Sequence, residues 1–309
     1  MAATETRWLT NDTAIIDLSF QSVPKVFAAY LLETSDGLAL IETGPTSTVA
    51  ALEAGVEALG REMDDIRHLL VTHIHLDHAG AAGLLMQRNP QTRLFVHEIG
   101  APHVIDPTNL VLSATRIYGD RMDQLWGEVL PVPADRVVAV SDGGTIDLGD
   151  RRVSVIYTPG HASHHVAFHD LRTNMTVVGD VAGIRIPPSP DVLPPTPPPD
   201  INVEHWHESV ERLRKLAPLR MLLSHFGVVN DVQDHLALLD RRLDEWTALI
   251  ESFVADGLDR DTMADRLMAH VMGQMVADGT TSLAQQTALA SPYGMSVDGL
   301  LRYLRKRGG

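Results

Sequence analysis

The segment Leu69–Gly80 constrains this chain more than any other part of its sequence, because an apolar run ends there in four side chains that can bind metal. The run itself predicts a buried strand. His73 and His75 lie two residues apart, so in an extended chain they point to the same side. Asp77 and His78 follow at the expected start of a helix, where they can face a second ion. Imidazole nitrogen and carboxylate oxygen suit zinc and other first-row divalent ions, so this segment predicts a metal site.

Three further metal-capable side chains follow apolar runs later in the sequence. They are His161, Asp180 and His225, and each stands at the expected end of a strand. Taken alone, each could be an ordinary hydrogen-bonded polar residue. Taken in order after the first four, they support one another as further candidate ligands.

Short apolar runs alternate with helical patterns over about the first two hundred residues, which is typical of a mixed α/β architecture. Strands are predicted at residues 14–18, 26–32, 38–42, 66–72, 94–97, 136–140, 153–158, 165–169, 176–179 and 219–224. Helices are predicted at residues 46–59, 77–88, 109–126 and 203–216, the third of them on the surface. The sequence contains no internal repeat.

Residues 186–200 contain eight prolines and cannot form a regular helix or a central strand. We expect an extended segment of polyproline type. Two interpretations are open. The segment is either a surface connector or a semi-rigid wall beside the metal site, since it begins soon after Asp180.

The chain from about Asn230 onward shows only helical patterns, with helices predicted at residues 232–253, 260–275 and 296–305. This divides the chain into a mixed domain, residues 1–229, and a helical extension, residues 230–309. The apolar stripes of these helices must be buried against something. We expect the extension to cover the mouth of the site as a lid or to contribute to a homodimer.

Composition narrows the classes of protein that this chain can belong to. It has no cysteine, which excludes disulfides, thiolate metal ligands and a cysteine nucleophile. Its 25 basic and 40 acidic residues give a formal charge of -15, which disfavours nucleic acid as a partner. No apolar run is long enough to span a membrane, and no basic segment followed by an apolar run stands at the N-terminus. We therefore expect a cytoplasmic protein that acts on a small molecule.

The chain resembles the metallo-β-lactamase superfamily, and within it the hydroxyacylglutathione hydrolases (glyoxalase II) and lactonases. The resemblance covers about residues 12 to 228. It implies an αββα sandwich with a metal site along one edge of two packed sheets. The residues that carry it are Glu42–Gly44, Thr72–Gly80, Thr158–His161, Gly179–Asp180 and Ser224–His225.

The resemblance also implies a role for each of the seven ligands. The first ion would be held by His73, His75 and His161. The second would be held by Asp77, His78 and His225. Asp180 would bridge the two ions, and Asp77 would also be able to carry a proton. Zinc is the expected metal, with iron or manganese as alternatives.

Two positions depart from the family pattern. Glu42 stands where the family usually has an aspartate that contacts the metal ligands, so its hydrogen bonds are expected to be rearranged. In the family's Thr-Pro-Gly-His-Thr-x-Gly-His motif, His165 takes the place of the second histidine, which commonly supports the ligands. His164 replaces the glycine, and we interpret it as a surface or packing residue.

Four further histidines lack ligand spacing to the main cluster. They are His97, His103, His205 and His207, and we expect none of them to be catalytic. Two aromatic residues at helical positions, Tyr118 and Trp206, could line a pocket but are more often core residues.

The function that these residues predict is metal-dependent hydrolysis. A hydroxide shared by two ions would attack the carbonyl of a thioester or lactone. No Gly-x-Ser-x-Gly motif is present, in agreement with a mechanism that needs no protein nucleophile. Three alternatives stay open: oxidation at a single iron, as in persulfide dioxygenases; cleavage of a small phosphodiester; and a binding protein that retains the fold.

Overall fold

The computed structural model describes residues 5–308 of the chain, which divide into two compact units. The first unit comprises the chain up to Tyr157 together with Val166–Val177. The second comprises Thr158–His165 and the chain from Val178 onward. The predicted division at residue 229 stays a prediction.

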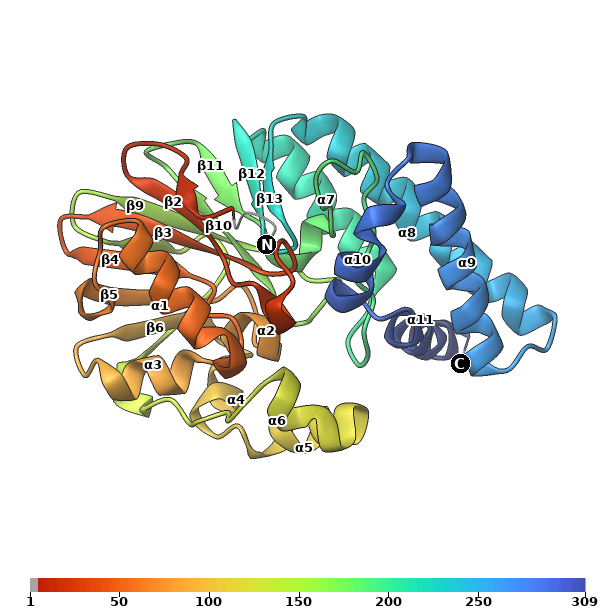
Figure 1. Ribbon diagram of the computed structural model, residues 1–309, viewed down its shortest axis with the longest axis horizontal. Coiled ribbons are helices and arrows are strands. Elements are labelled where there is room, and N and C mark those ends of the chain that lie inside the picture. The colour runs from red at the N-terminus through yellow and green to blue at the C-terminus, as the bar shows by residue number, and fades with distance from the viewer. Residues whose placement is uncertain (1–4, 309) are drawn as a thin grey trace. The chain divides into compact units, whose positions relative to one another are not determined.

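The first unit contains a seven-stranded sheet in the order β1 to β7 (Figure 1). Its first four strands pair antiparallel, and β4 to β7 pair parallel. Parallel neighbours need a crossover connection, and helical segments provide it here. The strands are β1 Arg7–Trp8, β2 Thr13–Asp17, β3 Ala28–Thr34, β4 Gly37–Ile41, β5 Ile66–Leu70, β6 Arg93–His97 and β7 Val137–Val140.

Four further strands of this unit pair antiparallel in the order β8 to β11. They are β8 Thr145–Asp147, β9 Arg152–Tyr157, β10 Val166–Asp170 and β11 Met175–Val177. The helices of the unit are α1 Val49–Ala58, α2 Leu76–Ala79, α3 Ala82–Arg88, α4 Ala101–Ile105, α5 Thr108–Tyr118 and α6 Met122–Leu125. The predicted α/β architecture is confirmed, and residues 109–126 are largely exposed as expected. The single helix predicted there is interrupted at Gly119, whose φ of 54° ends α5 before α6 begins. The short strand β8 was not predicted, because three residues carry too little periodicity.

A buried arginine ties the two sets of strands in the first unit together. Arg151, between β8 and β9, is 1% exposed and donates to the carboxylate of Asp170 at 2.7 and 3.2 Å. The same guanidinium donates to the carbonyl oxygens of Asp12 and Glu33, beside β2 and β3, and to the hydroxyl of Thr13. These hydrogen bonds join β10, which contains Asp170, to the chain at β2 and β3.

The helix predicted over residues 77–88 is wrong in one respect, because the structure has two helices there, α2 and α3. The break follows directly after the metal-capable residues. The carbonyl oxygen of His78 accepts hydrogen bonds from both the backbone N–H and the hydroxyl of Thr43, at 2.8 and 2.9 Å. With its lone pairs used in this way, that oxygen is not available to continue a helix.

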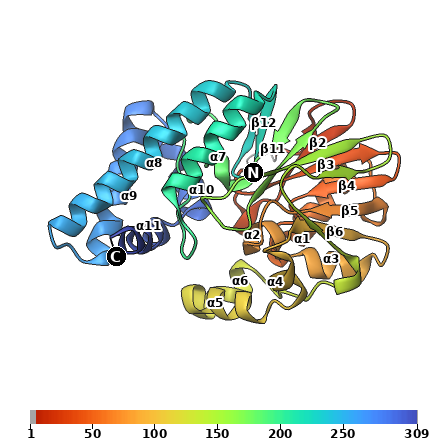
Figure 2. The same ribbon diagram turned by 180° about the vertical axis from the view of Figure 1, so that it is seen from behind.

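The second unit consists of two short strands and a set of helices (Figure 2). Its helical stretches confirm the helices predicted at 203–216 and beyond residue 230, and α10 was missed. The buried face of α8 includes Leu239, Leu243 and Trp246, all fully buried. Among the residues that the structure describes, no helix is long and apolar enough to cross a membrane. The elements are η6 Gly179–Ala182, α7 Val203–Leu216, β12 Arg220–Leu223, β13 Gly227–Val229, α8 Val232–Ala255, α9 Arg260–Asp278, α10 Ala284–Ala290 and α11 Tyr293–Arg307.

The proline-rich segment, residues 186–200, is not a surface connector, so that interpretation is wrong. Its middle part is buried, with Val192 and Thr196 fully inaccessible. An antiparallel bridge between Ile184 and Leu193 closes the segment on itself with hydrogen bonds of 2.8 and 2.9 Å. We refer to residues 186–200 as the strap.

Replacing Arg151 with methionine should lower the free energy of unfolding by about 3–5 kcal/mol, because the buried carboxylate of Asp170 would lose its ion-pair partner. Urea denaturation of the variant and the wild type measures this difference. The matched control is Arg152→Met on the exposed side of β9, for which we expect little change. Equal effects of the two substitutions would contradict the role of the buried guanidinium.

Candidate metal centre

The first donor cluster lies in the first unit, just beyond the end of β5. The Nε2 atom of His73 and the Nδ1 atom of His75 are 2.9 Å apart. The Nε2 atom of His78 lies 3.4 Å from a carboxylate oxygen of Asp77. His73 and His78 are essentially inaccessible to solvent, and their ring centroids are 4.0 Å apart. The structure therefore brings together the four residues that the sequence motif singled out.

Glu42 organises this cluster from the end of β4. Its carboxylate is 1% exposed and accepts hydrogen bonds from the hydroxyl of Thr72 at 2.6 Å and from its backbone N–H at 3.3 Å. The same carboxylate lies 3.1 Å from Nδ1 of His78. Glu42 adopts a φ of 67°, which costs a non-glycine residue about 1–3 kcal/mol and is sustained by these bonds.

This network determines which nitrogen of each ring carries the proton. The hydroxyl of Thr72 gives its proton to Glu42, so its oxygen accepts from Nδ1–H of His73 at 3.1 Å. Nδ1–H of His78 donates to Glu42 directly. Both rings therefore keep a lone pair on Nε2, which is the form in which histidine binds metal.

The second donor cluster lies in the second unit and centres on Asp180 in η6. One carboxylate oxygen of Asp180 is 3.3 Å from Nε2 of His161, and the other is 3.1 Å from Nε2 of His225. All three residues are at most 3% exposed. Each oxygen of a single carboxylate thus faces a different imidazole.

Two further groups orient this second cluster. Nδ1–H of His161 donates to the carbonyl oxygen of Pro195 in the strap at 2.8 Å, which leaves the lone pair on Nε2. His165 accepts from the backbone N–H of Asp180 at 3.1 Å and donates to the hydroxyl of Thr158 at 2.8 Å. His165 therefore supports Asp180, as the family pattern led us to expect. His164 is only 8% exposed, so it is not a surface residue.

The donor atoms of the two clusters suit a divalent metal ion. Ligand atoms about 2.0–2.2 Å from a tetrahedral zinc lie about 3.3–3.5 Å apart, close to the 2.9–3.4 Å separations within the clusters. The donors are imidazole nitrogens and carboxylate oxygens, and the chain has no thiolate. In the described part of the chain, histidine and aspartate side chains form groups that could hold a metal ion. The same donor types also accept iron and manganese.

The four histidines that lack ligand spacing in the sequence have other surroundings. His97 stacks on Tyr157 with ring centroids 4.7 Å apart, and burial lowers its pKa. His207 lies between Asp240 and Asp244, at 2.9 and 3.1 Å, and its hydrogen bond to Asp240 raises its pKa. The remaining two, His103 and His205, are exposed.

Of the two aromatic residues considered above, Trp206 is a core residue, as expected. It is fully buried, and its indole N–H donates to the carbonyl oxygen of Val181 at 2.7 Å. Tyr118 is half-buried and lies edge-on to Trp126 with ring centroids 5.0 Å apart.

Sequence reasoning missed two groups beside the second cluster. The acceptor for His161 is a backbone carbonyl, so no residue type in the sequence indicates it. His235 is 1% exposed and donates from Nε2 to the carbonyl oxygen of Ala182 at 2.7 Å, in the same short helix as Asp180. The signal for His235 was available, because it shares the buried face of α8 with Leu236 and Leu239.

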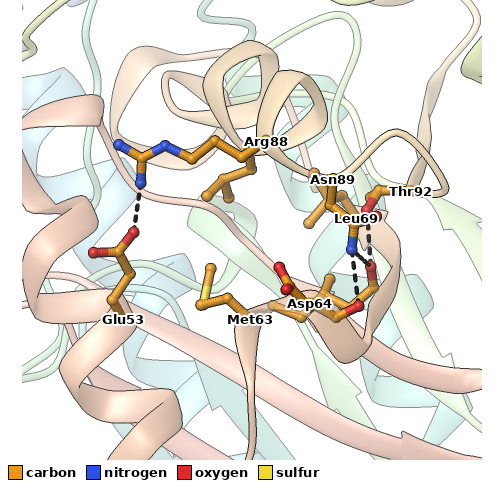
Figure 3. Close-up of a pocket in the computed structure, with 9 residues that line it drawn as sticks. Glu53, Met63, Asp64, Leu69, Arg88, Asn89 and Thr92 are labelled. Atoms are coloured by element: carbon orange, nitrogen blue, oxygen red, sulfur yellow. Dashed lines mark hydrogen bonds and ion pairs between the residues drawn. The ribbon is translucent and has the colours of Figure 1, made fainter.

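A separate hollow of about 130 Å³ lies between α1, β5 and α3 in the first unit (Figure 3). Asn89 and Thr92 donate to backbone carbonyl oxygens on one side of it. Arg88 and Glu53 form an ion pair on the other side. The side chains of Arg88, Asn89 and Thr92 are thus already engaged in structural contacts.

Comparison with known proteins identifies proteins that are similar to this chain. The model of the metallo-beta-lactamase superfamily matches residues 28–225. A metallo-beta-lactamase fold-containing protein of Sulfurisphaera tokodaii is 27% identical over 218 residues, covering 69% of this chain and 78% of that protein. A hydroxyacylglutathione hydrolase of Rhizobium etli is 29% identical over 142 residues, covering 45% of this chain and 43% of that protein.

A solved structure extends the likeness to the helical extension. The crystal structure of a metallo-beta-lactamase family protein of Thermus thermophilus matches with a TM-score of 0.69 and 21% identity. The match covers 97% of this chain and 95% of that one. It confirms the predicted metallo-β-lactamase fold with added C-terminal helices.

Replacing Glu42 with glutamine should weaken zinc binding by about 10–100-fold, because the amide NH2 would face the backbone N–H of Thr72 and the uncharged oxygen would accept less strongly from His78. A zinc titration against a competing chelator measures the change. Glu33→Gln, which alters a half-exposed ion pair with Arg61, is the matched control and should bind zinc like the wild type. Unchanged affinity in the Glu42 variant would show that the carboxylate does not set the ligand tautomers.

Acidification should destabilise the protein through His235. Burial lowers the pKa of this histidine from 6.5 to about 4, so between these values the unfolded chain binds a proton that the folded chain does not. Stability therefore falls as the pH drops from about 6.5 to about 4, by about 3 kcal/mol from this residue. Urea denaturation across this range should show a smaller loss in His235→Gln, and parallel curves would refute the assignment.

Proposed function

Because this chain belongs to the metallo-beta-lactamase superfamily, we propose that it is a metallohydrolase that binds two divalent ions and cleaves a thioester or lactone in a small molecule. One observation carries the proposal. The two oxygens of the Asp180 carboxylate face two different histidines, His161 and His225. A carboxylate with one imidazole beside each oxygen is suited to bridging two ions.

We propose the ligand sets that the family resemblance implies. The first ion would take His73, His75 and His161. The second would take Asp77, His78 and His225. Asp180 would belong to both. Zinc is the metal we propose, since all donors are nitrogen or carboxylate oxygen.

Ions bound in this way would supply Lewis acidity, which lowers the pKa of bound water to about 7 and polarises a carbonyl oxygen. The protein's own residues orient the side chains that would hold these ions. Glu42 holds His73 and His78 in the tautomer that presents Nε2. Pro195 does the same for His161 through its carbonyl oxygen.

Asp77 differs from the other ligands in its exposure. Its side chain is 17% exposed, whereas those of His78 and Asp180 are at most 4% exposed. A carboxylate in contact with water can exchange protons with it. We therefore assign Asp77 the additional role of carrying a proton to the leaving alkoxide or thiolate.

The substrate class rests on charge and on similarity. A formal charge of -15 repels long nucleic acids, which leaves a small molecule as the substrate. Similarity to a hydroxyacylglutathione hydrolase over less than half of either chain supports a thioester. A lactone presents the same type of carbonyl, so both belong in the first assays.

The test combines metal analysis with hydrolysis of a thioester and lactone panel. We expect about two zinc equivalents per chain, with activity lost on chelation and restored by zinc. Asp180→Asn should reduce kcat/KM at least about a hundredfold. His207→Asn, outside both clusters, is the control and should retain activity. One iron equivalent with oxygen uptake and no hydrolysis would replace the proposal with oxidation at a single iron.

A further inference from the structure

The strap contacts the second donor cluster through its backbone. The carbonyl oxygen of Pro195 accepts the only proton that the ring of His161 carries in its metal-binding form, at 2.8 Å. The position of this carbonyl therefore decides where Nε2 of His161 points. Anything that holds the strap in place also holds the ligand.

Helix α11 contacts the strap at Thr196, the residue that follows Pro195. The hydroxyl of Thr196 donates to the carbonyl oxygen of Ser296 at 3.2 Å. A Cβ atom added at Gly299 would lie 1.9 Å from the carbonyl oxygen of Thr196, far inside contact distance. Glycine in a helix interior costs about 1 kcal/mol relative to alanine, and here the close approach of two backbones requires it.

Two other helical residues hold the strap on either side of Thr196. Arg242 of α8 donates to the carboxylate of Asp191 at 2.8 Å. Arg302 of α11 donates to the carbonyl oxygen of Pro199 at 3.0 Å. Between these points the prolines restrict φ, so the strap transmits a displacement instead of absorbing it.

We propose that Gly299 of α11 is a positioning residue for the metal ligand His161. The contact runs from Gly299 to the backbone of Thr196, from there to the adjacent carbonyl of Pro195, and from that oxygen to Nδ1–H of His161. This inference rests on the proposed function, because it takes His161 as a ligand of the first ion. It gives the helical extension a part in building the metal centre, in addition to any role as a lid or dimer contact.

A methyl group at Gly299 would have to move the carbonyl oxygen of Thr196 by about 1.5 Å to reach an ordinary contact of about 3.5 Å. A comparable shift at Pro195 would break a hydrogen bond of 2.8 Å, since such bonds do not extend far beyond about 3.2 Å. His161 would then lose its fixed tautomer and orientation. The other proposed ligands of the first ion, His73 and His75, do not depend on the strap through any contact described above.

The experiment compares Gly299→Ala with Gly273→Ala in the full-length chain. Gly273 is the matched control, because it also lies inside a long helix but a Cβ atom there meets nothing within 4 Å. Zinc affinity is measured for each equivalent by competition with a chelator. We expect Gly299→Ala to weaken the binding of one of the two ions by about 10–100-fold and to leave the affinity for the other unchanged. Gly273→Ala should bind both ions like the wild type.

A second readout does not depend on metal or activity. Nitrogen-15 NMR of the metal-free chain should show His161 as the Nδ1–H tautomer in the wild type and as a mixture in Gly299→Ala. If the wild type binds no zinc, the proposed function fails, whereas this spectrum still tests the positioning. A folded Gly299→Ala variant with wild-type affinities and tautomer would overturn the inference.

A third variant decides the matter if Gly299→Ala does not fold. Thr196→Val keeps the shape of the side chain but removes its hydrogen bond to Ser296. We expect the same ion to bind about 3–10-fold more weakly and the His161 tautomer to become mixed, a smaller effect than that of losing the carbonyl contact. Unchanged zinc affinity and an unchanged tautomer in Thr196→Val would count against the role of α11.

Discussion

The buried carboxylate of Glu42 is the constraint around which the first donor cluster is built. A charge removed from water must be met by hydrogen bonds, and this one is met by Thr72 and His78. Those bonds fix the exit of β5 and the start of α2 in one step. Because the same bonds set ring protonation, the stability of this region and its ability to bind metal have a common origin.

The second cluster reaches the same result with different chemistry. Its ligand His161 is oriented by a peptide carbonyl, and Asp180 is held through its backbone N–H by His165. The first cluster therefore depends on which side chains are present, whereas the second depends on where the backbone runs. Substitutions should affect the two clusters differently: conservative changes at Glu42 disturb the first, and remote packing changes disturb the second.

Sequence periodicity was sufficient to predict most of the secondary structure, and the residue pattern singled out the seven side chains that lie in the two donor clusters. It failed where tertiary contacts override local preference. The predicted helix over residues 77–88 breaks because Thr43, distant in sequence, takes the carbonyl of His78. The acceptor for His161 could not be foreseen, because any residue type at position 195 supplies a carbonyl. The burial of the strap could not be predicted from its own sequence, because it depends on helices about a hundred residues away.

The composition of the strap has a consequence for hydrogen-bond balance. Eight of its fifteen residues are prolines, which offer a carbonyl oxygen but no N–H. Such a segment has more hydrogen-bond acceptors than donors, so its carbonyl oxygens cannot all be paired within the segment. It therefore presents an almost purely accepting edge, to which imidazole and guanidinium donors from the rest of the unit are drawn. A repeat of small polar residues in its place would compete for its own carbonyls and would leave the ring of His161 without a dedicated acceptor.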